Sequence, residues 1–399
     1  TVYRKGLANR YGAAMQTIAG IHYNFSLPED FWLLTNRCQS EGCLDLIRNV
    51  RRYSWLLMYL FGASPAISKS FLGDEWTNSG LDTLDSETLY LPYATSLRMS
   101  DIGYTNRSQS SLNICYNSLA KYVNSLERAT QTQYSSYQEI GVKVGGEYQQ
   151  LNTNLLQIEN EYYSSIRPKR VTLSGEKPIA ALRTRGVEYI EVRCIDINPF
   201  ESLGISISDA YFLDVFLIYC GLEKSNPITE EEGADITENF RKSVVQGRLP
   251  ELLLNHIDGP TPLSSWGKEL LETISPIAEL MDYATQSTRY TESLTSQSEK
   301  LVNVAKTPSA QLLMKLKKSK LSYTNFVHDL SEKHHDIFQQ NPLSPERLSY
   351  FTRVAEQSKR DQNIAERTDR VSFDEFLQAY QRTASSGSSS KNMLKEKNV

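Results

Sequence analysis

The chain reads Gln16-Thr17-Ile18-Ala19-Gly20-Ile21-His22-Tyr23-Asn24-Phe25 near its start and Tyr189-Ile190-Glu191-Val192-Arg193-Cys194-Ile195-Asp196 near its middle, and these two stretches decide the fold. Both predict β-strands, whose side chains alternate between two faces. The polar faces would carry Gln16, Ile18, His22 and Asn24 in the first strand and Glu191 and Arg193 in the second. A histidine, a carboxylate and a guanidinium in mid-strand favour a site for a metal ion or a phosphate, because a sheet that only fills a core rarely carries them.

Further strands and then helices surround these two stretches. Gly145-Gly146 inside residues 140–148 predicts a two-residue hairpin turn, and residues 42–61 repeat apolar side chains at helical spacing. From residue 208 onward the pattern is helical throughout, and Thr307-Pro308 is typical of a helix start. Strands followed by helices indicate an α+β protein. We expect a strand-rich region over residues 1–205, a helical region over 206–382 and a disordered tail over 383–399.

Composition narrows the possible partners. The formal net charge of -4 gives no electrostatic footprint for nucleic acid or for an anionic membrane. No apolar run approaches the length of a membrane span, and the densest, residues 55–63, is far too short. The 5 cysteines have no regular spacing, which suits a reducing cytoplasm better than secretion. We therefore expect a cytoplasmic, monomeric protein with neither nucleic acid nor a membrane as its partner.

Common nucleotide and hydrolase motifs are missing from the sequence. It contains neither a P-loop nor a Rossmann fingerprint, and it lacks a Gly-x-Ser-x-Gly elbow and Cys-x-x-Cys pairs. His22 by itself would more often be a structural histidine than a ligand. Glu191 could equally form a structural ion pair with an arginine or bind a metal, since a bare buried carboxylate is costly. His328, His334 and His335 lie among charged residues, which favours a solvated helix surface.

Two further segments could bring cations together. Arg98 and Tyr104 flank the turn-like Ser100-Asp101-Ile102-Gly103. Arg167-Pro168-Lys169-Arg170 places three cations in four residues, which suits a polyanion clamp, although such charge runs are more often solvated surface.

These segments carry a resemblance to a known family. Residues 15–28, which include Gln16-Thr17-Ile18-Ala19-Gly20-Ile21-His22, are similar to the proteobacterial type of glutamate–cysteine ligase (γ-glutamylcysteine synthetase). The other similar segments, all in family order, are residues 3–12, 59–66, 91–106, 156–161, 167–170 and 188–193. The resemblance is strong to about residue 200 and diffuse from there to about residue 380.

The resemblance implies a glutamine-synthetase-like, mostly antiparallel sheet and an ATP-dependent ligase. Such an enzyme joins the γ-carboxylate of glutamate to the amine of cysteine through a γ-glutamyl phosphate, the first step of glutathione synthesis. Phosphoryl transfer needs cations on the phosphate oxygens. The resemblance therefore implies Mg²⁺, with Mn²⁺ as the alternative ion, and ATP as the co-substrate.

The resemblance also implies roles for individual residues. His22 and Glu191 resemble metal ligands, and Arg98 and Arg193 resemble the cationic partners of phosphate or of a substrate carboxylate. Lys169 is placed near the ATP phosphates, and Ile18 near glutamate and the nucleotide. The residues that resemble the wall of the cysteine pocket are Tyr3, Leu7, Gln16, Tyr104 and Tyr163.

The sequence departs from the family pattern at its start. Family members begin with a segment whose strands carry further acidic residues, and that segment is absent here. Because Glu191 alone cannot hold several octahedral Mg²⁺ sites, we expect this polypeptide by itself to be inactive. The alternatives are a ligase of the same scaffold with another amine acceptor and a degenerate substrate-binding protein.

Overall fold

The two polar strands are neighbours in one antiparallel sheet. The structure is a computed structural model that describes residues 1–73, 77, 79–103, 112–173 and 175–382. Within these residues the sheet has the order β1 (Ile21–Phe25), β8 (Tyr189–Ile195) and β7 (Ile166–Lys169). This arrangement confirms the α+β class and the antiparallel pairing predicted from the sequence.

The strand register explains how one face of the sheet becomes polar. Asn24 lies opposite Glu191, and Glu191 lies opposite Arg167, so the three side chains form a row across the sheet. Ile190 and Val192 point to the other face and are fully buried. Burial also alternates along β1, where His22 and Asn24 are exposed. The predicted faces are thus confirmed within the strands.

The first strand begins later than predicted. It starts at Ile21, whereas residues Ala13–Thr17 form a 3₁₀ turn, η1. The Thr17 hydroxyl donates to the carbonyl of Ala14 at 2.7 Å, and the Gln16 amide donates to the carbonyl of Arg4 at 3.0 Å. Such local bonds compete with strand pairing. The prediction that Gln16 and Ile18 belong to the polar strand face is therefore wrong.

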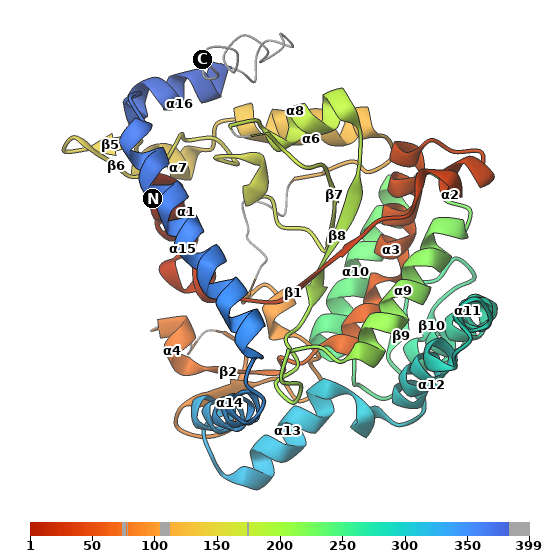
Figure 1. The fold of residues 1–399 in the computed structure, drawn as a ribbon. Coiled ribbons are helices and arrows are strands. Elements are labelled where there is room, and N and C mark those ends of the chain that lie inside the picture. The colour runs from red at the N-terminus through yellow and green to blue at the C-terminus, as the bar shows by residue number, and fades with distance from the viewer. Residues whose placement is uncertain (74–76, 78, 104–111, 174, 383–399) are drawn as a thin grey trace. The chain divides into compact units, whose positions relative to one another are not determined.

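The apolar face of the sheet packs on a long buried helix. Helix α3 (Gln39–Phe61) contacts β7 and β8, and also α9 (Ile207–Leu222) and α10 (Glu230–Gln246). Among the apolar residues whose spacing predicted this helix, Leu46, Val50, Leu57 and Leu60 are buried and Tyr53 is half-buried. Figure 1 shows these helices gathered on one side of the sheet. Burial of each such side chain stabilises the fold by roughly 1.5–3 kcal/mol.

Further helices and strands complete residues Thr1–Val327, which form one compact unit. The helices are α1 (Val2–Tyr11), α2 (Glu29–Leu34), α4 (Lys69–Leu72), α6 (Leu119–Gln131), α7 (Ser135–Ile140), α8 (Pro178–Arg185), α11 (Leu263–Thr285), α12 (Arg289–Val302) and α13 (Pro308–Ser319). The 3₁₀ turns are η3 (Leu97–Met99), η4 (Glu159–Glu161) and η5 (Val304–Lys306). The small strands are β2 (Ala66–Ser68), β3 (Asp82–Thr83), β4 (Thr88–Tyr90), β5 (Lys143–Val144), β6 (Glu147–Tyr148), β9 (Leu253–Leu254) and β10 (Thr261–Pro262).

Two local predictions are confirmed in this unit. Strands β5 and β6 form a hairpin, with Gly145 at φ 59° and Gly146 at φ 87°, values that glycine adopts readily. The Thr307 side chain accepts a hydrogen bond from the backbone N–H of Ala310, and Pro308 opens α13.

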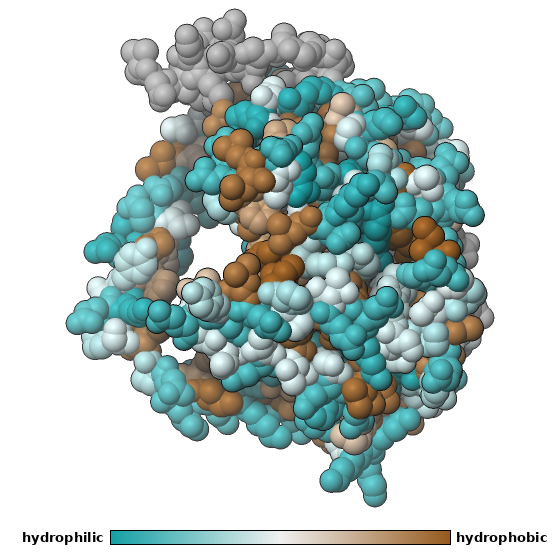
Figure 2. Space-filling view, turned by 90° about the vertical axis from the view of Figure 1, so that its right-hand side faces the viewer, coloured by the Kyte–Doolittle hydropathy of each residue, from teal (hydrophilic) through white to brown (hydrophobic). Residues whose placement is uncertain are grey.

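Hydrophilic residues cover most of the face seen in Figure 2, with apolar patches between them.

Helices also make up the described part of the second unit, which begins at His328. Helix α14 (Tyr323–Gln340) enters it, and α15 (Pro345–Thr368) and α16 (Phe373–Arg382) follow. His328 and His335 are exposed, as predicted, whereas His334 is half-buried. The division after residue 205 stays a prediction, and residues 383–399 lie outside the described residues. In the part of the chain that the structure describes, every helix is too short or too polar to cross a membrane.

Candidate active site

Glu191 is the centre of a group of charged side chains on the polar face of the sheet. Its Oε2 accepts a hydrogen bond from Arg193 Nη1 at 2.7 Å and lies 4.0 Å from Lys169 Nζ. Its Oε1 lies 3.7 Å from His22 Nδ1. The structure thus brings together four residues that sequence reasoning had singled out, from all three strands of the sheet.

The electrostatic surroundings keep Glu191 ionised. Burial acts to raise the pKa of this carboxyl group, but the hydrogen bond and charge of Arg193 outweigh it, with Lys169 and His22 adding to the effect. The pKa of Glu191 therefore lies below its ordinary value. The pKa of His22 is lowered as well, first by burial and then by the charge of Arg193. A neutral imidazole beside a carboxylate is a suitable pair of metal ligands.

A β-bulge sets the direction of two of these side chains. Ile21 pairs with Ile195 and Tyr23 pairs with Val192, so His22 alone faces the two residues Arg193 and Cys194. A bulge of this kind bends the strand and redirects its side chains, and bulges are common next to active sites. The pattern of alternating residues contains no sign of it.

Arg98 occupies a different position from the one that its predicted role suggests. Its Nε donates to Asp196 Oδ1 at 2.6 Å, and the guanidinium is almost completely buried. It lies close enough to affect the pKa of His22, but Glu191 is paired with Arg193 and Lys169 instead. Its part in binding a substrate anion stays a prediction.

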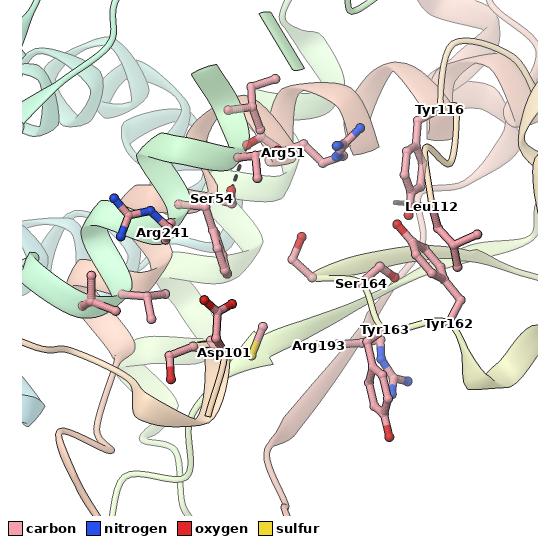
Figure 3. A pocket seen from close by; sticks show the side chains of 18 of the residues that line it. Arg51, Ser54, Asp101, Leu112, Tyr116, Tyr162, Tyr163, Ser164, Arg193 and Arg241 are labelled. Atoms are coloured by element: carbon pink, nitrogen blue, oxygen red, sulfur yellow. Dashed lines mark hydrogen bonds between the residues drawn. The ribbon is translucent and has the colours of Figure 1, made fainter. Parts of the chain in front are cut away.

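A cavity of about 430 Å³ opens beside His22, Arg193 and Tyr163. Figure 3 shows Arg51 and Ser54 of α3 and Arg241 of α10 on one side of it, across from Tyr163 and Arg193. Sequence reasoning missed several of the lining residues, namely Arg51, Ser54, Tyr116, Tyr162 and Arg241, whereas Asp101 lies in the turn-like segment that it had named. Nothing local in the sequence sets Arg51 apart from Arg48 and Arg52 of the same helix.

Two of the residues predicted to line a pocket for the substrate cysteine lie close together, and their role stays a prediction. The side chains of Arg10 and Glu161 form an ion pair at 3.0 Å with no solvent exposure, which fixes α1 against η4. This brings Tyr3 near Tyr163, and burial together with Glu161 and Tyr163 raises the pKa of Tyr3. Leu7 and Ile18 are half-buried and Gln16 is exposed. Tyr104 lies outside the described residues.

Lys169 lines a second cavity, of about 330 Å³. Burial lowers the pKa of Lys169, and the nearby Glu191 carboxylate partly offsets that effect. Arg167 and Arg170 line the same cavity, so the predicted polyanion clamp faces an open space. Pro168 sits in β7 at the edge of the sheet, where a proline removes no hydrogen bond.

Comparison with known proteins identifies the family. The family model described as glutamate-cysteine ligase matches residues 1–243. The glutamate–cysteine ligase of Azotobacter vinelandii is 52% identical over 393 residues, which cover 95% of this chain and 74% of the relative. That of Pseudomonas aeruginosa is 50% identical over 390 residues, with 95% and 73% covered.

A solved structure agrees with these relatives. The crystal structure of glutamate–cysteine ligase from Francisella tularensis in complex with AMP matches with a TM-score of 0.89 and 34% identity, covering 97% of this chain and 77% of that one. A bifunctional glutathione synthetase from Pasteurella multocida shares the fold, with a TM-score of 0.57 at 23% identity, over 83% of this chain and 38% of that one. The chain belongs to the glutamate–cysteine ligase family.

Proposed function

We propose that this protein joins the γ-carboxylate of L-glutamate to the amine of L-cysteine and converts ATP to ADP and phosphate, the first step of glutathione biosynthesis. The observation that supports this most is the group around Glu191, where Arg193, Lys169 and His22 surround one carboxylate between two cavities. The family membership names the reaction, and this group offers charges suited to it.

The chemistry requires that the carboxylate be activated, because a carboxylate is a poor acyl donor. An oxygen of the glutamate γ-carboxylate attacks the terminal phosphorus of ATP, and ADP leaves. The cysteine amine then attacks the acyl carbon of the γ-glutamyl phosphate, phosphate leaves, and the amine loses a proton to solvent. Negative charge moves among phosphate oxygens in both steps, so fixed cations and exclusion of water are the protein's main contributions.

The charged residues divide this work according to their positions. Arg193 lines the larger cavity and Lys169 the smaller one, and Glu191 lies between them. We assign Arg193 to the oxygens of the transferred phosphate and Lys169 to the other ATP phosphates. Arg98 is assigned to a substrate carboxylate or phosphate close to β8.

His22 and Glu191 fit a divalent cation in part. The 3.7 Å between Nδ1 and Oε1 lets one ion contact both, and the lowered pKa values of both groups leave them free of protons near pH 7. A bound Mg²⁺ or Mn²⁺ supplies positive charge against phosphate oxygens. Magnesium commonly takes one or two carboxylates and completes its shell with water and phosphate.

The amine acceptor would lie in the pocket near Tyr3 and Tyr163. These rings, with Leu7 and Gln16 on the same helix and turn and with Tyr104, would form an apolar wall for a small thiol side chain. Ile18 would contact glutamate and the nucleotide.

The five cysteines of this chain all carry free thiols, which suits a cytoplasmic enzyme.

The test is product formation from glutamate, cysteine and Mg·ATP, with γ-glutamylcysteine identified by mass spectrometry and ADP by a coupled assay. We expect the full natural protein, called the ligase-active form below, to make γ-glutamylcysteine and ADP only when glutamate, cysteine and Mg·ATP are all present. Release of ADP without γ-glutamylcysteine would contradict the proposed reaction. Ligation of another amine in preference to cysteine would contradict the proposed substrate.

A further inference from the structure

The bulge between β1 and β8 exposes backbone carbonyls that need hydrogen-bond donors. Ile21 pairs with Ile195 and Tyr23 with Val192, so the ladder is interrupted at Arg193 and Cys194. Buried carbonyl groups without partners are costly, and a bulge persists only where its surroundings satisfy them. Arg98, a side chain that is distant in sequence, donates to carbonyl groups in this region.

Arg98 bonds the backbone on both sides of the bulge. Its Nη2 donates to the carbonyl of Ile195 at 2.9 Å, and both terminal nitrogens lie 3.4 Å from the carbonyl of Arg193. The guanidinium therefore bridges the residues before and after Cys194. Because guanidinium groups are planar and always charged, such a bridge fixes backbone direction better than a flexible lysine would.

Asp196 fixes the guanidinium in turn. Its Oδ1 accepts from Arg98 Nε at 2.6 Å and from the Ser96 hydroxyl at 3.0 Å. Its Oδ2 accepts from the backbone N–H of Ala63 at 2.8 Å and from the Ser64 hydroxyl at 2.7 Å. The carboxylate is buried, with 2% of its side chain exposed. The three bonds from Ala63, Ser64 and Ser96 fix the carboxylate, and the carboxylate in turn fixes where Arg98 can lie.

Gly20 closes the other side of this arrangement. A Cβ atom at residue 20 would lie 2.6 Å from Arg98 Nη1 and 2.7 Å from its Cζ, closer than atoms normally approach. The guanidinium occupies the space that any other side chain at this position would need. Glycine at residue 20, one residue before β1, thus allows the strand to approach Arg98.

We propose that Asp196 is a positioning residue of the active site: it holds Arg98 against Gly20, and Arg98 holds the bulge that points His22 and Arg193 toward the larger cavity. The activity readout below rests on the proposed function, whereas the structural readout does not. In this proposal Arg98 does more than bind a substrate anion. It acts on the cation site through the backbone of β8, and Asp196 keeps it in place.

The experiment compares D196N and G20A with two matched controls. D282N removes a buried charge of similar importance to folding, since Asp282 accepts hydrogen bonds from Tyr290, Thr291 and Ser287 at the start of α12. G233A places a Cβ in α10 where the nearest atom would be 3.7 Å away. Crystal structures of each variant show the β1–β8 register and the distance from His22 Nδ1 to Glu191 Oε1. Kinetic and binding assays on the ligase-active form measure KM for each substrate and the Mg²⁺ dependence of nucleotide binding.

We expect D196N and G20A to lengthen the His22–Glu191 distance beyond 3.7 Å and to weaken Mg²⁺-dependent nucleotide binding at least tenfold. D282N should lower Tm without changing that binding, and G233A should change neither. Unchanged register and binding in both D196N and G20A would overturn the proposal. A selective rise in KM for cysteine or glutamate, with Mg²⁺ dependence intact, would also overturn it and leave Arg98 as a direct anion partner. If the wild type forms no γ-glutamylcysteine, the proposed function fails. The crystal structures then still show whether Asp196 and Gly20 hold the bulge in place.

Discussion

Glu191 contacts the residues to which we assign most of the chemistry of this protein. Substitution by glutamine removes its negative charge with little change in the size of the side chain. In the ligase-active form, E191Q should lower kcat by roughly a hundredfold, the usual loss when one group that organises transition-state charge is removed. The glutamine would lose the ion pairs with Arg193 and Lys169 and the negative charge facing His22. Steady-state ADP release measures the effect.

The neighbouring Glu188 provides the control for that substitution. It pairs with Arg170 at 3.5 Å, and 43% of its side chain is exposed. E188Q should keep kcat within about twofold of the wild type, as is usual when an exposed ion pair of small energetic value is removed. Equal losses of kcat in E188Q and E191Q would mean that any change in or beside β8 lowers activity. That result would contradict the assignment of Glu191 to the active site.

At the residue scale, sequence reasoning succeeded where side-chain alternation decides position. His22, Glu191 and Arg193 could be grouped because strand periodicity is local, and the structure places them within one cluster. The pairing of Arg98 with Asp196 could not be predicted, because it joins residues far apart in sequence through an irregular turn. Arg51 and Arg241 were missed because only tertiary packing brings α3 and α10 to the same cavity.

At the scale of elements, the 3₁₀ turn η4 contains two buried glutamates, Glu161, which forms a close ion pair with Arg10, and Glu159, whose pKa is raised by burial. Glu161 is paired with Arg10 and accepts hydrogen bonds from the Tyr11 hydroxyl and the backbone N–H of Gln157, at 2.6 Å each. E161A should lower the free energy of unfolding by roughly 3–5 kcal/mol, because it leaves Arg10 as an uncompensated buried charge. Denaturant unfolding measures this. A loss below 1 kcal/mol would contradict the view that this pair fixes α1 beside Tyr163.

Glu159, the other buried glutamate of η4, should make stability depend on pH. Burial raises its pKa above 4.5, with the charge of Lys177 partly offsetting this and Glu127 adding to it. The folded state therefore holds the proton more tightly than the unfolded chain, and stability falls as pH rises from about 4.5 through the folded-state pKa. E159Q should lack this loss. Unfolding curves at pH 4 to 7 that run parallel for wild type and E159Q would contradict the prediction.

The elements also show where local signals mislead. Gly145-Gly146 predicted the hairpin of β5 and β6 correctly, because a two-residue turn depends on its own backbone angles. The start of β1 was predicted too early, because alternating residues before Ile21 form hydrogen bonds within η1 and to α1. The helical pattern expected from residue 208 onward was wrong at residues 253–262, where strands β9 and β10 pair. For β1 the element type followed from the sequence, but its first residue depended on a bond to Arg4 in the preceding helix.

At the scale of the whole molecule, the central claim is that one cluster on a three-stranded sheet activates a carboxylate by phosphorylation. The helices after residue 208 were predicted from their periodicity, but that pattern does not show that α9 and α10 pack on α3 behind the sheet. Only the assembled core places Arg193 of β8 at the larger cavity and Lys169 of β7 at the smaller one. The family membership names the reaction, and the charges at these cavities suit it.

The most direct test follows oxygen atoms. Glutamate carrying ¹⁸O in its γ-carboxylate is supplied with cysteine and Mg·ATP to the ligase-active form, and the released phosphate is analysed by mass spectrometry. The account predicts one ¹⁸O atom in each phosphate, because the attacking carboxylate oxygen stays with phosphorus when the amine displaces it, and it predicts a much slower reaction in E191Q. Unlabelled phosphate, or an E191Q variant as fast as the wild type, would contradict it.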